Sequence, residues 1–279
     1  MNWQRAKTVL LIALLLTDIF LAGVLVADRM RIASQENTSD FHRETVRILK
    51  DNGITFDAEI PKEGTELPVL DVQFETDSSE NWNERFFGGR GDIVDNQEQM
   101  LVIKGGHATL NVTDKRHILY ESEGTSNREL KKSEAEALAK SFLKKRGFST
   151  DDMRLVRGER KGNRWKLVYT CLYDDDYIES TYTEFEMVGD AVVKMDRLWI
   201  DVVAETDESQ PLPLASQSLF RLLSHESLKG RTIKKIDPCY YFNPAEQATV
   251  GNLFHATRGY TTVAWRMVLD DGEELVLLH

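Results

Sequence analysis

Cysteine is scarce in this chain of 279 residues, where only Cys171 and Cys239 occur. Two cysteines are too few for a disulfide scaffold, and neither has a second thiol or an imidazole at the spacing of a zinc site. Both stand in strand-like runs, YTCLY and PCYYF, which favours two buried free thiols that pack as small hydrophobic side chains. A disulfide between them is the alternative, because an exported protein permits it chemically.

The chain also lacks the motifs that accompany common active sites. It has no H-E-x-x-H, no G-x-S-x-G and no G-x-x-x-x-G-K-S/T, so no zinc-protease helix, nucleophile elbow or phosphate-binding loop is expected. The acidic run at 174–176 lacks the EF-hand spacing and is interpreted as a solvated hairpin turn. The glycine-rich segment 87–92 is interpreted as a surface loop. The histidines occur singly, at His42, His107, His117, His225, His255 and His279. We therefore expect no catalytic residue, no metal and no cofactor.

The charge balance is acidic. The chain has 46 acidic and 35 basic residues and a formal net charge of −11. Repulsion of phosphate by such a surface argues against a nucleic-acid partner. The same repulsion argues against a body that lies flat on anionic lipid. Most of these charges are expected to form an ordinary solvated surface.

Long apolar runs are equally few, and the one of membrane-spanning length covers residues 8–27. About twenty helical residues, rising about 1.5 Å each, cross the hydrocarbon core of a bilayer. Arg5 and Lys7 precede the run and no acidic residue does, which favours a cytoplasmic N-terminus. We therefore expect a single-pass protein of the cell membrane, with residues 1–7 as a cytoplasmic tip and an extracytoplasmic head after the span.

Two alternatives compete with this topology. Arg29 and Arg31 follow the span and equal in number the basic residues before it, so a cytoplasmic head is one alternative. The other is a cleaved secretory signal, which needs small residues ahead of its cleavage site. The best such site, after Ala27, has Leu25 at the −3 position. This poor fit favours a retained anchor.

Asp18 lies near the middle of the span. A carboxylate there costs about 2.5–3.5 kcal/mol on insertion scales unless it is protonated or partnered. A neutral acid that caps its own helix is one interpretation. The other is a polar contact with a membrane helix of another chain, since a single span has no partner of its own. The residues expected to carry this contact are Asp18, Thr17, Phe20, Leu14 and Leu21.

Residues 33–125 are predicted to form a first α+β domain. Its opening helix has Phe41, Ile48 and Leu49 as an apolar stripe and ends at Gly53, which is suited to a left-handed cap. Apolar alternation and turn residues predict the rest. The predicted segments are a strand at 54–61, a strand at 67–75, a loop at 78–92, a hairpin at 99–114 and a strand at 117–122.

Residues 126–279 are predicted to contain two units, each a helix followed by an antiparallel meander. The first unit, 133–203, opens with the capping box Ser133 and Glu136. The second unit, 214–279, has a helix at 214–224 and ends in a hairpin that turns at 270–272. The fold class predicted for the head is therefore α+β, with two domains built on antiparallel sheets.

Four short segments of the sequence resemble the YycI family. They are W-x-R-A-K-T at 3–8, T-D-I-F-L at 17–21, I-L-K-D-N-G-I at 48–54 and E-I-P-K-E at 59–63. Proteins of this family are membrane-anchored accessory proteins of the YycFG (WalKR) two-component system of Gram-positive bacteria. The acidic run at 174–176 and the glycine-rich segment 87–92 depart from the resemblance.

The resemblance implies a non-enzymatic regulator with an extracytoplasmic head of two α+β domains, similar in style to PepSY modules. Its implied partners are a sensor histidine kinase and a paralogue. The kinase, YycG (WalK), controls cell wall metabolism and contacts the span through its own membrane helices, and the paralogue, of YycH type, pairs with the head. A rival function of another class is an exported enzyme or inhibitor tethered at the cell envelope. The lack of a clustered nucleophile, base or metal set disfavours that rival.

Overall fold

A computed structural model describes residues 39–278, except 62–63, 98, 246 and 248–255, and in addition Thr17 and Leu21. The predicted span at 8–27 and the tip at 1–7 therefore lie outside the described residues, apart from those two positions. Within the part of the chain that is described, no helix is both long enough and apolar enough to cross a membrane.

The head contains few helices and many strands, as expected for an α+β protein. The helices are α2 (Ser39–Asp51), α3 (Ser79–Phe87), α4 (Lys132–Lys144) and α5 (Ala215–Leu219), followed by the 3₁₀ turns η1 (Phe220–Ser224) and η2 (Glu226–Leu228). The strands of the first half are β1 (Thr55–Phe56), β2 (Thr65–Phe74), β3 (Asp92–Gln97), β4 (Met100–Gly105), β5 (Ala108–Thr113) and β6 (His117–Ser122). Those of the second half are β7 (Met153–Lys161), β8 (Arg164–Tyr173), β9 (Asp176–Val188), β10 (Ala191–Leu198), β11 (Ile200–Leu212), β12 (Thr232–Tyr241), β13 (Arg258–Tyr260), β14 (Thr262–Leu269) and β15 (Glu274–Leu277).

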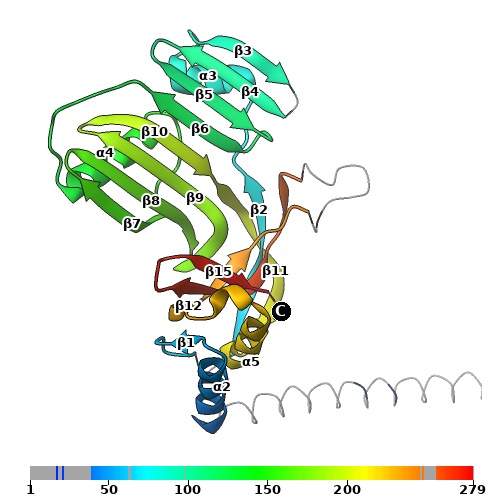
Figure 1. The fold of residues 1–279 in the computed structure, drawn as a ribbon. Helices are drawn as coiled ribbons and strands as arrows, with labels where there is room; N and C mark the ends of the chain where they lie inside the picture. The colour runs from blue at the N-terminus through cyan, green and yellow to red at the C-terminus, as the bar shows by residue number, and fades with distance from the viewer. Residues whose placement is uncertain are drawn as a thin grey trace, which may run out of the picture.

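Most strands of the described chain belong to one twelve-stranded sheet that forks at β9. On one side β9 pairs with β8, which in turn carries the edge strand β7. On its other side, the start of β9 pairs with β12 and the remainder pairs with β10. The sheet continues from β10 through β6, β5 and β4 to β3, and from β12 through β14 to β15. Figure 1 shows the two branches as an upper and a lower part of the head.

A long two-stranded ribbon of β2 and β11, extended by β13, forms a second sheet. This ribbon runs from the lower part to the upper part in Figure 1. Only one residue, the completely buried Trp199, lies between the end of β10 and the start of β11. The chain therefore passes directly from the large sheet into the ribbon. The ribbon therefore couples the two branches that diverge at β9.

Helices cover one face of the upper part. Phe142 of α4 contacts Tyr120 of β6 and Phe185 of β9, with ring centroids 5.3 and 5.9 Å apart. Phe86 of α3 contacts the same Tyr120 ring at 5.6 Å. Figure 1 accordingly shows α3 and α4 behind the sheet. The opposite face of strands β6 and β8 to β10 has no helix over it among the described residues, and this bare surface is called the open face below.

Several predicted elements are confirmed. Gly53 has a φ of 83° just after α2, as the left-handed cap requires. The hairpin predicted at 99–114 is the β4–β5 pair, and the turn predicted at 270–272 joins β14 to β15. Asp174 and Asp175 form the tight turn between β8 and β9, whereas Asp176 of the predicted turn is the half-buried first residue of β9. The order of helix and meander in both predicted units is also present, although β9 pairs with β12 in parallel, so the sheet is mixed rather than antiparallel.

The loop predicted at 78–92 is wrong, because most of it is helix α3. The Ser78 side chain accepts a hydrogen bond from the backbone N–H of Asn81 at 3.2 Å and caps the helix. Trp82 and Phe86, one turn apart, are buried in the core, and Gly88 ends the helix with a φ of 60°. The serine cap, the apolar pair at i and i+4 and the terminal glycine were all legible in the sequence.

Other boundaries also differ. Helix α4 begins at Lys132, and the backbone N–H of Lys131 donates to the Glu134 side chain at 2.8 Å, so Glu134 caps the helix start two residues ahead of the capping box predicted at Ser133 and Glu136. The strand predicted at 54–61 is only the two residues of β1. The helix predicted at 214–224 is the short α5 followed by η1.

The predicted boundary near residue 125 falls inside the large sheet. Strand β6, which precedes that boundary, pairs with β10, which follows it. Strand β2 pairs in the same way with β11 across the boundary. The buried core is likewise one cluster that draws side chains from both predicted regions. The regions 33–125 and 126–279 therefore share their sheets and their core.

Candidate interaction surface

Two of the five residues expected to form the membrane contact are described by the structure. Thr17 and Leu21 are both helical and exposed, and 53% of Leu21 is accessible to solvent. Asp18, Phe20 and Leu14 lie outside the described residues. Thr17 and Leu21 are four positions apart, which places them on the same face of a helix.

The open face of the large sheet presents half-buried polar side chains. Successive residues of a strand point to opposite faces, so the residues between the buried core positions gather here. Their charges alternate in sign: Lys166 and Glu184 form an ion pair at 2.8 Å, and Lys194 lies 3.9 Å from Asp196. Residues of this face are Lys166, Val168, Tyr182, Glu184, Glu186, Lys194, Asp196 and His117.

His117, Asp196 and Tyr182 form a hydrogen-bonded cluster on this face. His117 Nε2 lies 2.8 Å from Asp196 Oδ1, and the Tyr182 hydroxyl donates to the same oxygen at 3.0 Å. The hydrogen bond with Asp196 raises the pKa of His117, and the same bond lowers the pKa of Asp196. Burial, followed by the charge of Asp196, raises the pKa of Tyr182. The cluster favours the protonated form of the imidazole. Asp196 and Tyr182, which contact this imidazole, are not the serine, threonine or cysteine nucleophiles that a catalytic histidine activates.

A hollow of about 800 Å³ lies where the open face meets the lower branch of the sheet. Val168 and Tyr182 line it from the upper strands, and Tyr177 lines it at the start of β9. Its basic lining residues are Arg154, Arg157, Lys235 and Arg266, and its acidic ones are Asp271, Glu273 and Glu274. Because both signs are present, the hollow is suited to a mixed polar surface rather than to a single strong anion.

A buried ion-pair network forms one wall of this hollow. Only 3% of Arg266 is accessible, and its Nε lies 2.7 Å from Glu179 Oε1. The guanidinium also pairs with Glu274 and lies 4.1 Å from the ring centroid of Tyr177. Burial raises the pKa of Glu179 to about 7 despite the opposing charge of Arg266. Arg266 lies on β14 and Glu179 on β9. The periodicity of the sequence does not predict that these two side chains form an ion pair.

The two cysteines are free and buried, as the packing interpretation predicted. Cys171 and Tyr240 both pair with Ile178 of β9, one from each side. Cys239 precedes Tyr240 and so points to the opposite face from Cys171. Two strand spacings, about 9.5 Å, also exceed the roughly 7 Å limit for Cα atoms of a disulfide. The disulfide alternative is therefore wrong.

The thiols are also poorly suited to nucleophilic chemistry. Burial raises the pKa of both Cys171 and Cys239, and the nearby carboxylates of Asp152 and Glu179 act in the same direction. A thiolate, the reactive form, is disfavoured under these conditions. Within the described ranges, no group of three or more histidine, cysteine, aspartate or glutamate residues has the geometry of a metal site.

Comparisons with known proteins agree with the fold. A family model described as YycI protein matches residues 33–272. No curated protein sequence matches the chain. The crystal structure of YycH from Bacillus subtilis is similar at 12% identity and a TM-score of 0.52, covering 78% of this chain and 53% of YycH. The chain thus spans about half the length of YycH, and the likeness is one of fold.

Two further solved structures have lower TM-scores. An uncharacterized protein from Eubacterium rectale is similar at 10% identity and a TM-score of 0.49, with 81% of this chain and 86% of that chain covered. The YpeB C-terminal domain of Bacillus megaterium is similar at 11% identity and a TM-score of 0.33, with 87% and 98% covered.

Proposed function

The chain belongs to the YycI family, and we propose that it is a non-enzymatic accessory regulator that acts on the sensor histidine kinase of the YycFG system through protein contacts. The observation that carries this proposal is the family match, which extends over residues 33–272 and so over nearly the whole head. The fold shared with YycH supports it. The rival function, an exported enzyme or inhibitor, has no observation in its favour among the described residues.

In this proposal the protein is anchored in the cell membrane by residues 8–27, with residues 1–7 in the cytoplasm and the head outside. The apolar run and the acid-free basic tip support this orientation. A reporter enzyme that is active only outside the membrane, fused after Arg31, is expected to be active. An inactive fusion beside an active cytoplasmic reporter at the same position would contradict the orientation.

The span is proposed to contact the membrane helices of the kinase, YycG (WalK). Leu14, Thr17, Asp18 and Leu21 follow the spacing i, i+3, i+4 and i+7, which defines one face of a helix, with Phe20 beside it. The polar pair Thr17 and Asp18 lies at the centre of this face. A partner helix that hydrogen-bonds with Asp18 offsets the cost of its burial in lipid.

The head is proposed to pair with a YycH-type protein. The open face supports a protein partner, because its half-buried Tyr182 is of a residue type enriched at interfaces and its paired charges suit the polar rim of a contact. The hollow beside it, which is lined by Tyr177, Tyr182 and Arg266, offers the concave part of such a surface.

The proposal is tested with the full chain in its own membrane. Affinity purification of the tagged protein from detergent-solubilised membranes is expected to recover the kinase and the YycH-type protein. In a matched variant, residues 8–27 are replaced by an unrelated span of equal length. This variant is expected to remain exported and folded but to lose its effect on a kinase-dependent reporter gene. Normal regulation by the variant would show that the span is only a tether, and recovery of neither partner would contradict the proposed function.

A further inference from the structure

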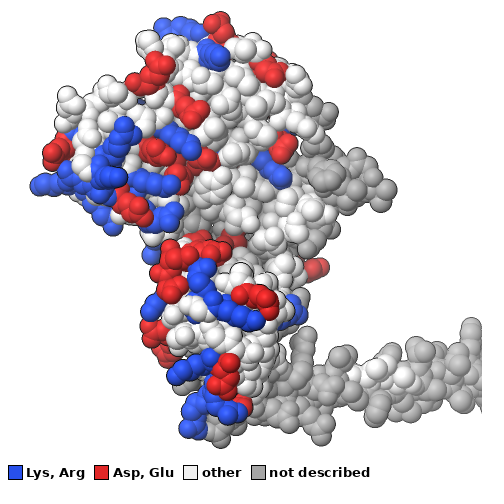
Figure 2. All heavy atoms as spheres, in the orientation of Figure 1, with Lys and Arg blue, Asp and Glu red and all other residues white. Residues whose placement is uncertain are grey.

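The β7–β8 hairpin is strongly basic in an otherwise acidic chain. Between Met153 and Lys166 the sequence has six basic residues and one acidic residue, whereas the whole chain has a net charge of −11. Figure 2 shows Lys and Arg side chains gathered over these two strands. The basic residues are Arg154, Arg157, Arg160, Lys161, Arg164 and Lys166.

Most of these cations are already paired. Arg154 lies 3.2 Å from Asp175, and Arg160 lies 2.8 Å from Glu129. Lys166 forms its ion pair with Glu184, and Arg157 lies 3.7 Å from Glu159. Lys161 and Arg164 remain, and neither side chain has a hydrogen-bond or ion-pair partner in the described part of the chain.

Lys161 and Arg164 face each other across the end of the hairpin. They are direct cross-strand partners on either side of the two-residue turn Gly162-Asn163, in which Gly162 has a φ of 64°. Both side chains are exposed. Like charges placed directly opposite each other destabilise a hairpin. A local arrangement that opposes folding is expected where a surface serves binding.

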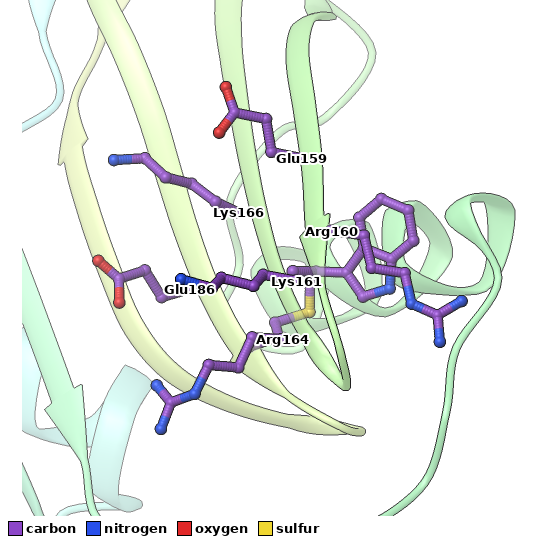
Figure 3. Close-up of a pocket in the computed structure, with 8 residues that line it drawn as sticks. Glu159, Arg160, Lys161, Arg164, Lys166 and Glu186 are labelled. Atoms are coloured by element: carbon purple, nitrogen blue, oxygen red, sulfur yellow. The ribbon is translucent and has the colours of Figure 1, made fainter.

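The neighbours of this pair define what it can bind. A hollow of about 580 Å³ beside the pair is lined by Lys161, Arg164 and Lys166 together with Glu159 and Glu186. Figure 3 shows Lys161 and Arg164 on adjacent strands at the hairpin end, with Arg160 pointing to the other side. Two free cations thus lie beside two carboxylates within one shallow site.

We propose that Lys161 and Arg164 bind a carboxylate-bearing segment of the YycH-type protein that is proposed to pair with the head. This inference rests on the proposed function and locates one contact of the head. A guanidinium forms paired hydrogen bonds with a carboxylate, and an adjacent ammonium group accommodates a second acidic side chain. Glu159 and Glu186 repel a polymer or lipid surface that is negative throughout, but they accept a basic residue of a mixed protein surface.

The test uses the full chain, co-purified with the kinase and the YycH-type protein from membranes. The charge reversal Lys161→Glu with Arg164→Glu is expected to reduce recovery of the YycH-type protein tenfold or more. The swap Lys161→Arg with Arg164→Lys is expected to preserve it. Lys104→Glu with Lys115→Glu, at exposed positions of the β3–β6 region, makes the same change in net charge and is expected to leave recovery unchanged.

The outcomes separate the two proposals. Recovery of the YycH-type protein with the wild-type chain but not with the charge-reversed chain supports the inference, provided that the two chains have the same unfolding temperature. Equal recovery of the partner with the wild-type and the charge-reversed chain overturns the inference but does not contradict the proposed function. Failure of the wild-type chain to recover either partner contradicts the proposed function and removes the basis of the inference.

A lipid-dependent effect would also overturn the inference. Each variant is therefore compared in nanodiscs of phosphatidylcholine alone and of phosphatidylcholine with phosphatidylglycerol. A contact with a protein carboxylate is expected to show the tenfold loss in both. A loss confined to discs that contain phosphatidylglycerol would assign Lys161 and Arg164 to lipid headgroups instead.

Discussion

Arg197 and Glu75 form a buried ion pair that links the large sheet to the β2–β11 ribbon. Arg197 of β10 is completely inaccessible, and its Nε donates to Glu75 Oε2, directly after β2, at 2.7 Å. Its Nη1 donates to the Thr183 hydroxyl at 2.7 Å, and its guanidinium lies 4.2 Å from the ring centroid of Trp199. The pair thus fixes the point at which the chain passes from one sheet to the other.

Breaking this pair is expected to destabilise the head strongly. Glu75→Gln preserves the shape of the side chain but leaves the buried guanidinium without a counter-charge, which costs about 3–5 kcal/mol in comparable buried pairs. Urea denaturation followed by tryptophan fluorescence measures the change. The exposed pair Arg47 and Glu44 is the control, since Glu44→Gln should have little effect. Equal effects of the two substitutions would contradict the role of the buried pair.

Local patterns in the sequence predicted local structure well. The cap at Gly53, the β4–β5 hairpin and the turn at 270–272 depend on neighbouring residues, whose spacing and turn chemistry the sequence contains. The loop predicted at 78–92 differs from the structure because Trp82 and Phe86 bury the inner face of helix α3, while charged and amide residues form most of the rest of the helix. Burial of those two rings overrides a weak helical propensity.

Long-range pairing could not be predicted. His117 and Asp196 are 79 positions apart, and alternation identifies the face of a strand but not the neighbour of the strand. The sequence therefore predicted a domain boundary near residue 125, because it gave no sign that β6 pairs with β10 across that boundary. The Lys161 and Arg164 pair is local by contrast, because a two-residue turn at Gly162-Asn163 implies it directly.

The His117 and Asp196 pair predicts a dependence of stability on pH. The pKa of His117 is raised from 6.5, so its contribution is complete below that value and is lost as the pH rises through the folded-state pKa. The pKa of Asp196 is lowered from 3.8, so its contribution is lost only as the pH falls through the lower folded-state value. The pair therefore stabilises the folded state most between pH 3.8 and pH 6.5.

His117→Gln is the variant that measures this effect. The loss of unfolding free energy relative to the wild type is expected to be larger at about pH 5.5 than at about pH 8.5, because the protonated fraction of the wild-type imidazole falls as the pH rises. His107→Gln is the control, since 89% of the His107 side chain is exposed. A loss that is the same at both pH values would show that the His117 contact does not depend on charge.

The cysteines are expected to be inert in the folded protein. Cys171 donates to Asp152 at 3.3 Å, and both thiols are buried and lie on opposite faces of the sheet. Alkylation with iodoacetamide should modify neither residue in the native protein and both residues after unfolding. Mass spectrometry without reductant should not find the loss of two hydrogen atoms that a disulfide would cause. Rapid modification of either thiol in the native state would contradict their burial.

Replacing one of the two facing cations at the hairpin end is expected to stabilise the fold. Lys161→Glu puts an opposite charge directly across from Arg164, and such cross-strand pairs contribute roughly 0.2–1 kcal/mol. Thermal unfolding should shift upward, while partner recovery falls because one of the two cations is gone. Lys104→Glu should show no gain, since Asp92 of β3 and Thr109 of β5 lie across from it and neither is a cation. A decrease in stability for Lys161→Glu would show that the two cations do not repel each other.

The span is expected to work through Asp18 as well as through its length. Asp18→Leu removes the carboxylate that lipid disfavours, so membrane insertion should improve. The same change removes the proposed polar contact, and because hydrogen bonds between membrane helices contribute roughly 0.6–2 kcal/mol, association with the kinase should weaken about threefold to thirtyfold. Asp18→Asn keeps a hydrogen-bonding side chain and should retain much of the association. Leu16→Ala, which leaves the polar pair intact and lies on the opposite side of the helix from Asp18, controls for a change in the span itself. Association is measured by co-purification from membranes at matched expression. If Asp18→Leu and Asp18→Asn both associate as strongly as the wild type, Asp18 caps its own helix and the contact lies elsewhere.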